Sequence, residues 1–112
     1  MNTDELIQRV VETIRDEYQP EKIIVFGSRV WGDPDEDSDL DVLVIKNTEK
    51  REVDRMREVS RLVRRFQQRP YLLPLDIFVK TPAELQERLA IGDDFIGDIV
   101  ERGRVMYERR VR

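Results

Sequence analysis

The hydrophobic and polar positions along the chain follow two spacings, one typical of helices and one typical of strands. Apolar residues at helical spacing begin at Thr3 and end before Pro20, and the same spacing returns from about Glu49 to Gln68. Residues 81–84, with the sequence Thr-Pro-Ala-Glu, form the pattern of a capping box that opens a third helix. A fourth helix follows the Gly-Asp turn at 92–93, so the sequence predicts four helices.

Three short apolar runs lie between these helices and predict buried strands at residues 23–26, 41–45 and 75–79. Pro74, at the entry of the third run, favours a strand start or a sheet edge. Gly103 is the expected C-cap of the last helix, and residues 104–107 are expected to add a short terminal strand. Helices interleaved with three to four strands predict one α/β (α+β) domain over residues 1–112, with a short mixed sheet flanked by helices.

The helical spacing also predicts which side chains face the core. For the second helix these are Val53, Met56, Ser60, Val63 and Phe66, with Val59 and Leu62 beside them, and for the last helix they are Phe95, Ile96, Ile99 and Val100. The opposite face of the second helix carries an arginine ridge made of Arg57, Arg61, Arg64, Arg65 and Arg69. This ridge can be a solvated face or a docking surface for an acidic partner. Nucleic-acid binding is the least favoured alternative, because no aromatic residues are interleaved and the sequence pI is acidic.

Composition narrows the chemistry that the domain can perform. The chain has no cysteine and no histidine, which excludes disulfides, cysteine-ligated zinc, thiol nucleophiles and imidazole bases. Its net charge of −4 comes from 24 acids and 20 bases, but six of the acids lie within residues 33–41, a segment without a base. The rest of the chain is mildly basic, with 18 acids against 20 bases, so the acidic segment requires its own explanation.

Nothing in the sequence indicates export or membrane insertion. The longest apolar runs contain four residues, far fewer than a membrane-spanning helix needs. Asp4, Glu5 and Arg9 occupy the region where a signal peptide requires apolar residues. We therefore expect a cytoplasmic protein without membrane contact.

The alternating acids of the acidic segment first suggest a calcium-binding loop. An EF-hand loop needs Gly at position six and Glu at position twelve, and a loop that starts at Asp33 or Asp35 has neither. Residues 33–37 lie among Gly, Pro and Ser, which is typical of a solvated turn. Asp39 and Asp41 instead lead into an apolar strand, where residues i and i+2 share a face. These two carboxylates can therefore chelate Mg²⁺, or both can simply be exposed at the strand entrance.

Two further features join this pair of carboxylates. Asp76 is the only acid in the third apolar run, and burying it without a partner would be costly. It therefore either faces solvent at a sheet edge or joins Asp39 and Asp41 around a metal ion. Gly27 and Ser28 directly follow the first apolar run, and a helix that starts there would present backbone N–H groups and a hydroxyl to an anion.

Together these elements resemble the signature of the DNA polymerase β nucleotidyltransferase superfamily: Gly-Ser at 27–28, Asp-Leu-Asp at 39–41 and the later Asp76. The fuller stretches Gly-Ser-Arg-Val-Trp-Gly at 27–32 and Ser-Asp-Leu-Asp-Val-Leu-Val at 38–44 look like its minimal nucleotidyltransferase (MNT) branch. The resemblance covers almost the whole chain, and no motif position departs from the pattern. It implies a single polymerase β-like nucleotidyltransferase domain.

The resemblance also implies roles for the acids. Asp39 and Asp41 would bind two Mg²⁺ ions, while Asp76 would help to bind one of them and activate the attacking hydroxyl. Metal ions that polarise the α-phosphate and neutralise the leaving pyrophosphate make this chemistry possible without histidine. The three acids are thus the predicted catalytic and metal-binding residues.

A second set of residues is implied to hold the nucleotide. Gly27 and Ser28 would bind the phosphates of ATP, and Arg29 would add a charge to the triphosphate or form a surface ion pair. Trp31, in the same loop, either packs on the core or lines the nucleotide pocket. ATP and Mg²⁺ are therefore the expected cofactors.

The resemblance finally implies a partner. MNT proteins are commonly antitoxins of HEPN-domain ribonuclease toxins, which they neutralise by transferring AMP from ATP to a toxin tyrosine. We therefore expect a protein adenylyltransferase that acts on a cognate HEPN toxin. A chain of 112 residues leaves no room for the acceptor-binding domain of larger superfamily members, so the acceptor is expected to come from another chain. Two alternatives stay open: a catalytically silent antitoxin that inhibits by binding alone, and a nucleotidyltransferase acting on a small molecule.

Overall fold

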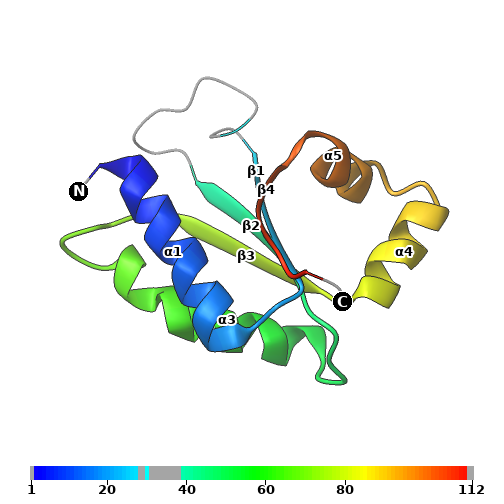
Figure 1. Cartoon of the computed structure of the whole chain (residues 1–112), viewed down its shortest axis with the longest axis horizontal. Helices are drawn as coiled ribbons and strands as arrows, with labels where there is room; N and C mark the ends of the chain where they lie inside the picture. The colour runs from blue at the N-terminus through cyan, green and yellow to red at the C-terminus, as the bar shows by residue number, and fades with distance from the viewer. Residues whose placement is uncertain (1, 28–29, 31–38, 111–112) are drawn as a thin grey trace.

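A four-stranded mixed sheet organises the part of the chain that the structure describes, with helices on both of its faces (Figure 1). The computed structural model describes residues 2–27, 30 and 39–110. In chain order the elements are α1 (Thr3–Tyr18), β1 (Lys22–Phe26), β2 (Leu40–Ile45), α3 (Glu52–Gln67), β3 (Leu75–Lys80), α4 (Pro82–Ala90), α5 (Asp94–Arg102) and β4 (Arg104–Glu108). These elements confirm the predicted α+β class and the short mixed sheet.

The strands lie in the order β3-β2-β1-β4. β1 pairs antiparallel with β2 and with β4, whereas β2 and β3 are parallel. A parallel pair needs a long crossover connection, and α3 provides it. β3 is an edge strand directly after Pro74, as predicted, and the expected terminal strand forms the other edge as β4.

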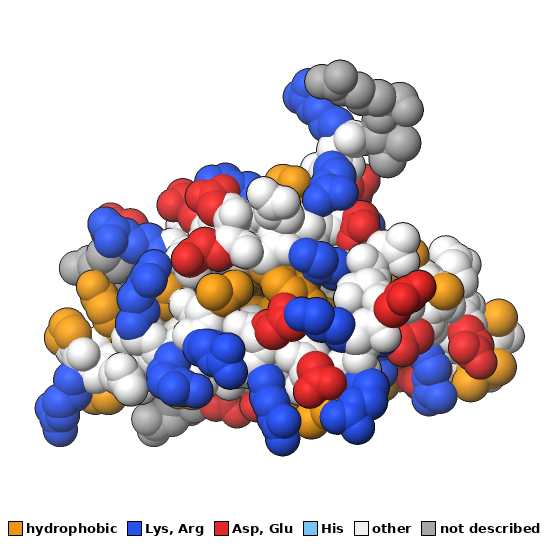
Figure 2. Space-filling view, turned by 90° about the horizontal axis from the view of Figure 1, so that it is seen from below, with side chains coloured by type: hydrophobic (Ala, Val, Ile, Leu, Met, Phe, Trp, Pro, Cys, Tyr) orange, Lys and Arg blue, Asp and Glu red, His pale blue; other side chains and the backbone are white. Residues whose placement is uncertain are grey.

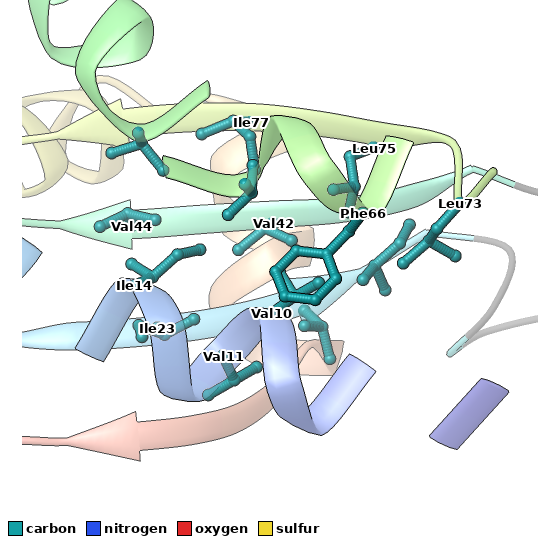
Figure 3. Close-up of a cluster of buried hydrophobic side chains, with 14 of the residues drawn as sticks. Val10, Val11, Ile14, Ile23, Val42, Val44, Phe66, Leu73, Leu75 and Ile77 are labelled. Atoms are coloured by element: carbon teal, nitrogen blue, oxygen red, sulfur yellow. The ribbon is translucent and has the colours of Figure 1, made fainter. Parts of the chain in front are cut away.

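Helices α1 and α3 pack on one face of the sheet and form the main core with it (Figure 3). Alternation along each strand sends every second residue to this face, so the strands contribute Ile23, Val25, Leu40, Val42, Val44, Leu75, Ile77 and Val79. From α1 come Leu6, Val10, Val11, Ile14 and Tyr18, and from α3 come Val59, Val63 and Phe66. Both helices thus bury their apolar stripes against this one face of the sheet.

The second face of the sheet is covered by α5, with α4 beside it, on the side opposite α1 and α3 (Figure 1). Its smaller core consists of Ile24, Phe26, Leu43, Ile45, Ile96 and Ile99. Leu85 and Leu89 of α4 and Phe78 of β3 pack against it and are only partly buried. The second face is therefore less completely covered by helices, which leaves part of it accessible to a ligand.

Polar side chains cap the starts of α1, α4 and α5. Asn2 Oδ1 accepts the N–H of Glu5 at 2.9 Å, so α1 begins where the sequence predicts. The capping box of α4 is also confirmed, because Thr81 Oγ1 accepts the N–H of Glu84 at 3.1 Å and Glu84 Oε1 accepts the N–H of Thr81 at 2.8 Å. None of the helices in the described ranges is long and apolar enough to cross a membrane.

The predicted core face of α3 is confirmed at Val63 and Phe66, which are buried, and at Met56, which packs against the core, but it is wrong at Val53. Val53 is 45% exposed, whereas Val59 is fully buried and central to the core. Arg55, which the apolar pattern did not include, is also buried. Its guanidinium donates to the Glu84 carboxylate at 2.6 Å and to the Lys50 carbonyl at 2.7 Å. A charged residue can be buried there because these partners replace the lost water, which periodicity alone does not reveal.

The predicted core face of α5 was also too wide. Ile96 and Ile99 are buried as expected, but Phe95 is 52% exposed and Val100 is 43% exposed. A helix that covers only part of a sheet buries a narrow stripe, and the flanking apolar residues stay in contact with water. Gly103 does follow the helix as its C-cap, and its N–H donates to the Ile99 carbonyl at 2.8 Å.

Candidate active site

The register of the sheet brings two of the predicted acids side by side. Asp41 lies opposite Asp76 in the parallel pair β2/β3 and opposite Phe26 in the antiparallel pair β1/β2. All three lie on the second face of the sheet, because the adjacent residues Val42 and Ile77 belong to the main core on the first face. These three residues, Phe26, Asp41 and Asp76, form a row that crosses three strands at the end of β1. We call it the carboxylate row, after its two acids.

The charged form of Asp41 is disfavoured in this row. Its carboxyl group is partly buried, and removal from water is the largest cause that raises the pKa of Asp41 from 3.8 to about 6. The charges of Asp76 and Asp39 and a hydrogen bond with Asp76 act in the same direction. Two acids held together on the surface of a sheet are a typical mark of a functional site, because the fold gains nothing from their repulsion.

Gly27 packs directly against the carboxylate of Asp41. A β-carbon at Gly27 would lie 2.1 Å from Asp41 Oδ2, closer than any side chain can approach. The residue also has φ +92°, a backbone conformation that favours glycine, and its carbonyl accepts the N–H of Val30 at 2.9 Å in the turn that follows β1. Glycine is therefore required here by both conformation and space, and it lies beside the predicted metal ligand.

Asp39 is the third acid that was predicted to bind metal. Asp39 is exposed, lies immediately before β2, and acts on Asp41 through its charge. Among the described residues no three acidic side chains stand close enough together to hold a metal ion as a set. Asp41 and Asp76 nevertheless fit a hard divalent cation such as Mg²⁺, because both offer carboxylate oxygens and their mutual repulsion would be relieved by it. Among the described residues, Asp39 is the other acid whose charge acts on Asp41, and it could complete such a set.

Several predicted residues lie outside the described residues. They are Ser28 and Arg29, implied to bind the phosphates, Trp31, and the acids of the predicted solvated turn at 33–37. The roles assigned to them stay predictions.

The sequence did not predict an aromatic cluster, formed by Phe26, Phe78 and Phe95, at the carboxylate row. The ring centroid of Phe26 lies 5.9 Å from that of Phe78 and 5.7 Å from that of Phe95, and the last two are 6.1 Å apart. Phe78 and Phe95, with Leu43 and Lys80 of the sheet, line a cleft of about 440 Å³ on the second face. The sequence does indicate that Phe78 shares a strand face with Asp76, because it follows two residues later. It does not indicate that Phe95 of α5 packs beside them, because that contact depends on the tertiary fold.

The arginine ridge is separate from this site. All of its members except Arg69 lie on α3, which covers the first face of the sheet, whereas the carboxylate row faces the other side. Arg65 donates to Thr13 Oγ1 at 3.2 Å and lies over the Phe66 ring, and Arg57 is 3.9 Å from an oxygen of Asp54. In the view from below, basic and acidic side chains are interspersed over the surface (Figure 2).

Comparison with known proteins agrees with the fold. The chain belongs to the nucleotidyltransferase domain family, whose pattern it matches over residues 7–106. It is also similar to the crystal structure of a "putative nucleotidyltransferase" from Sulfolobus solfataricus, with a TM-score of 0.62 and 26% sequence identity over 94% of this chain and 79% of the other. No curated protein matches the sequence. The general class of reaction, transfer of a nucleotidyl group, is therefore established by family and fold.

Proposed function

We propose that the protein is an Mg²⁺-dependent adenylyltransferase that transfers AMP from ATP to a tyrosine hydroxyl of a HEPN-domain toxin and so acts as its antitoxin. The observation that carries the proposal is the pairing of Asp41 with Asp76 across β2 and β3, with Gly27 leaving space for the Asp41 carboxylate. The family supports nucleotidyl transfer in general, while the resemblance of the motifs to the MNT branch supports the protein acceptor.

The two carboxylates have different surroundings, which favours different roles. Asp41 is partly buried, lies in a central strand and contacts Gly27, so it is suited to hold a metal ion and the phosphates in place. Asp76 is exposed on the edge strand β3, so an acceptor hydroxyl can reach it from solvent. When bound, Mg²⁺ would neutralise these acids and polarise the α-phosphate.

The transfer step then needs one base from the chain. The acceptor oxygen forms a bond to the α-phosphorus, the bond from that phosphorus to the bridging oxygen breaks, and pyrophosphate leaves with the bonding electrons. The proton of the acceptor hydroxyl passes to a carboxylate oxygen of Asp76, the more accessible of the two acids. No imidazole is required for this step.

The test is a labelling experiment with matched variants. The protein is incubated with ATP labelled in the α-phosphate, Mg²⁺ and the protein encoded by the neighbouring gene, as the proposed toxin, and label on that protein is measured. We expect label with the wild type and with Glu87→Gln, an exposed acid of α4 outside the site, and loss of at least about 100-fold with Asp41→Asn or Asp76→Asn.

The alternatives predict different results. If both variants leave the toxin unlabelled yet neutralise it as well as the wild type does, inhibition is by binding alone. If the wild type labels a small hydroxyl compound and never the neighbouring protein, the acceptor is a small molecule. The first result would reject adenylylation as the means of neutralisation, and the second would reject the protein acceptor while leaving the nucleotidyl transfer itself in place.

A further inference from the structure

Phe95 is the exposed member of the aromatic cluster beside the carboxylate row. The residue is 52% exposed, yet its ring meets those of Phe26 and Phe78 edge-on, with interplanar angles of 77° and 69°. Phe26 is only 2% exposed, so a buried ring holds Phe95 from behind. An aromatic face that is fixed in position and still open to solvent is ready to stack against a flat ligand.

The cleft in front of Phe95 offers no free charge among the described residues. Lys80 Nζ lies 2.8 Å from Glu52, and Arg88 donates to Asp93 at 2.7 Å, so the charged side chains of the lining already pair with each other. A triphosphate would gain little there. The aromatic lining and the volume of about 440 Å³ fit a neutral, planar group instead.

The cleft also lies at a suitable distance from the acids. Phe78 follows Asp76 by two residues on the same strand face, which separates the two positions by about 7 Å. A nucleotide whose α-phosphate is at Asp41 and Asp76 must extend over one sugar ring before its base begins. A donor that lies along β3 would therefore bring its base to Phe78 and Phe95.

The exposed apolar residues of α5 do not form a broad docking face. Phe95 and Val100 are five positions apart, which puts them about 140° apart around the helix. Phe95 points into the cleft with Phe78, whereas Val100 lies away from its lining. The exposure of Phe95 is thus local to the cleft.

From this geometry we propose that Phe95, supported by Phe26 and Phe78, is the stacking platform for the nucleobase of the nucleotide donor. The inference rests on the proposed nucleotidyl transfer and adds to it the place where the base binds. Because stacking depends on the size of the flat face more than on hydrogen bonds, purine nucleotides bind more tightly than pyrimidine nucleotides at this site.

The test compares two ligands and three variants by isothermal titration calorimetry in the presence of Mg²⁺. ATP carries the base, and inorganic triphosphate lacks it. Phe95→Ala weakens the binding of ATP about tenfold and leaves the binding of triphosphate unchanged, because only the stacked base is lost. Phe95→Trp restores ATP binding. The matched control Val100→Ala, which removes another exposed apolar side chain of the same helix, changes neither affinity.

Each other outcome overturns the inference in a recognisable way. If the wild type binds both ligands and Phe95→Ala binds ATP as tightly, the base lies elsewhere while the nucleotide site stands. If Phe95→Ala keeps its affinity for ATP but labels the protein acceptor poorly, the cleft belongs to the acceptor. If the wild type binds neither ligand, the proposed transfer fails and the base site fails with it.

Discussion

Gly27 and Asp41 are in such close contact that a β-carbon on the glycine would lie 2.1 Å from the Asp41 carboxylate oxygen. We predict that Gly27→Ala lowers the free energy of unfolding by about 2 kcal/mol, because the new methyl displaces Asp41 and the φ of +92° strains a non-glycine residue. The same displacement moves the carboxylate that we propose as a metal ligand by about 1 Å, so the transfer rate should fall about 100-fold or more. Urea denaturation and the labelling assay measure the two effects.

Gly92 provides the matched control for that variant. It has φ +76° but no atom within 4 Å of its virtual β-carbon, so Gly92→Ala suffers only the backbone strain of about 1 kcal/mol. We expect Gly92→Ala to keep the wild-type transfer rate at a temperature where both proteins are folded. Equal activity of the two alanine variants would show that contact with Asp41 is irrelevant.

The raised pKa of Asp41 predicts how metal-free stability depends on pH. Because the pKa is about 6 in the folded protein and 3.8 as an isolated group, the folded state holds the proton to higher pH. The free energy of unfolding therefore decreases as the pH rises from about 4 to 6. Asp41→Asn removes this titration, so we expect it to be more stable than the wild type above pH 6 and equally stable near pH 4. Denaturation in EDTA at several pH values tests this, and parallel profiles would contradict it.

The ion pair between Arg55 and Glu84 ties α3 to α4, and its two halves should not be equivalent. Arg55 is buried, whereas the Glu84 side chain is 37% exposed. Glu84→Ala leaves a buried cation without its partner and breaks the capping box, and we expect a loss of about 2 kcal/mol. Arg55→Met leaves a carboxylate that water can reach, and we expect about 1 kcal/mol. The reverse order in urea denaturation would refute this reasoning.

The same pair gives a pH dependence of the opposite sign. The hydrogen bond from Arg55 is the main cause that lowers the pKa of Glu84 below 4.5 in the folded protein. Its contribution to stability is therefore present above pH 4.5 and is lost as the pH falls through the folded pKa. The stability difference between the wild type and Glu84→Gln should shrink accordingly in acid. Glu87→Gln, an exposed change on the same helix, should follow the wild type throughout.

Alanine substitutions at two further glycines test two different effects, helix propensity at one and close packing at the other. Gly97 lies within α5 with no atom within 4 Å of its virtual β-carbon, so Gly97→Ala should raise the free energy of unfolding by about 0.5–1 kcal/mol. At Gly103 a β-carbon would lie 2.4 Å from the Ile99 carbonyl oxygen and 2.6 Å from a methyl group of Ile24. Gly103→Ala should therefore lower the free energy of unfolding by about 2 kcal/mol or more. Thermal denaturation of both variants checks the contrast.

Local patterns predicted most of the elements because local chemistry specifies them. The capping box at Thr81 and Glu84, Pro74 before an edge strand, and Gly103 after α5 each act within a few residues. Periodicity was less reliable for burial. It placed Val53 and Phe95 in the core, because it records which side of a helix is apolar but not how much of that side another element covers.

The sequence alone determined which acids are predicted to carry the chemistry, the order of helices and strands, and the absence of histidine and cysteine from any mechanism. Only the tertiary structure decided which acids meet. Asp41 and Asp76 are 35 positions apart in the sequence and become neighbours because β2 and β3 pair in parallel, with their register fixed by burial of one strand face. The contact of Gly27 with Asp41 and the placement of Phe95 beside this row arise in the same way. They depend on which elements pack together, and this is set by the whole core rather than by any one segment.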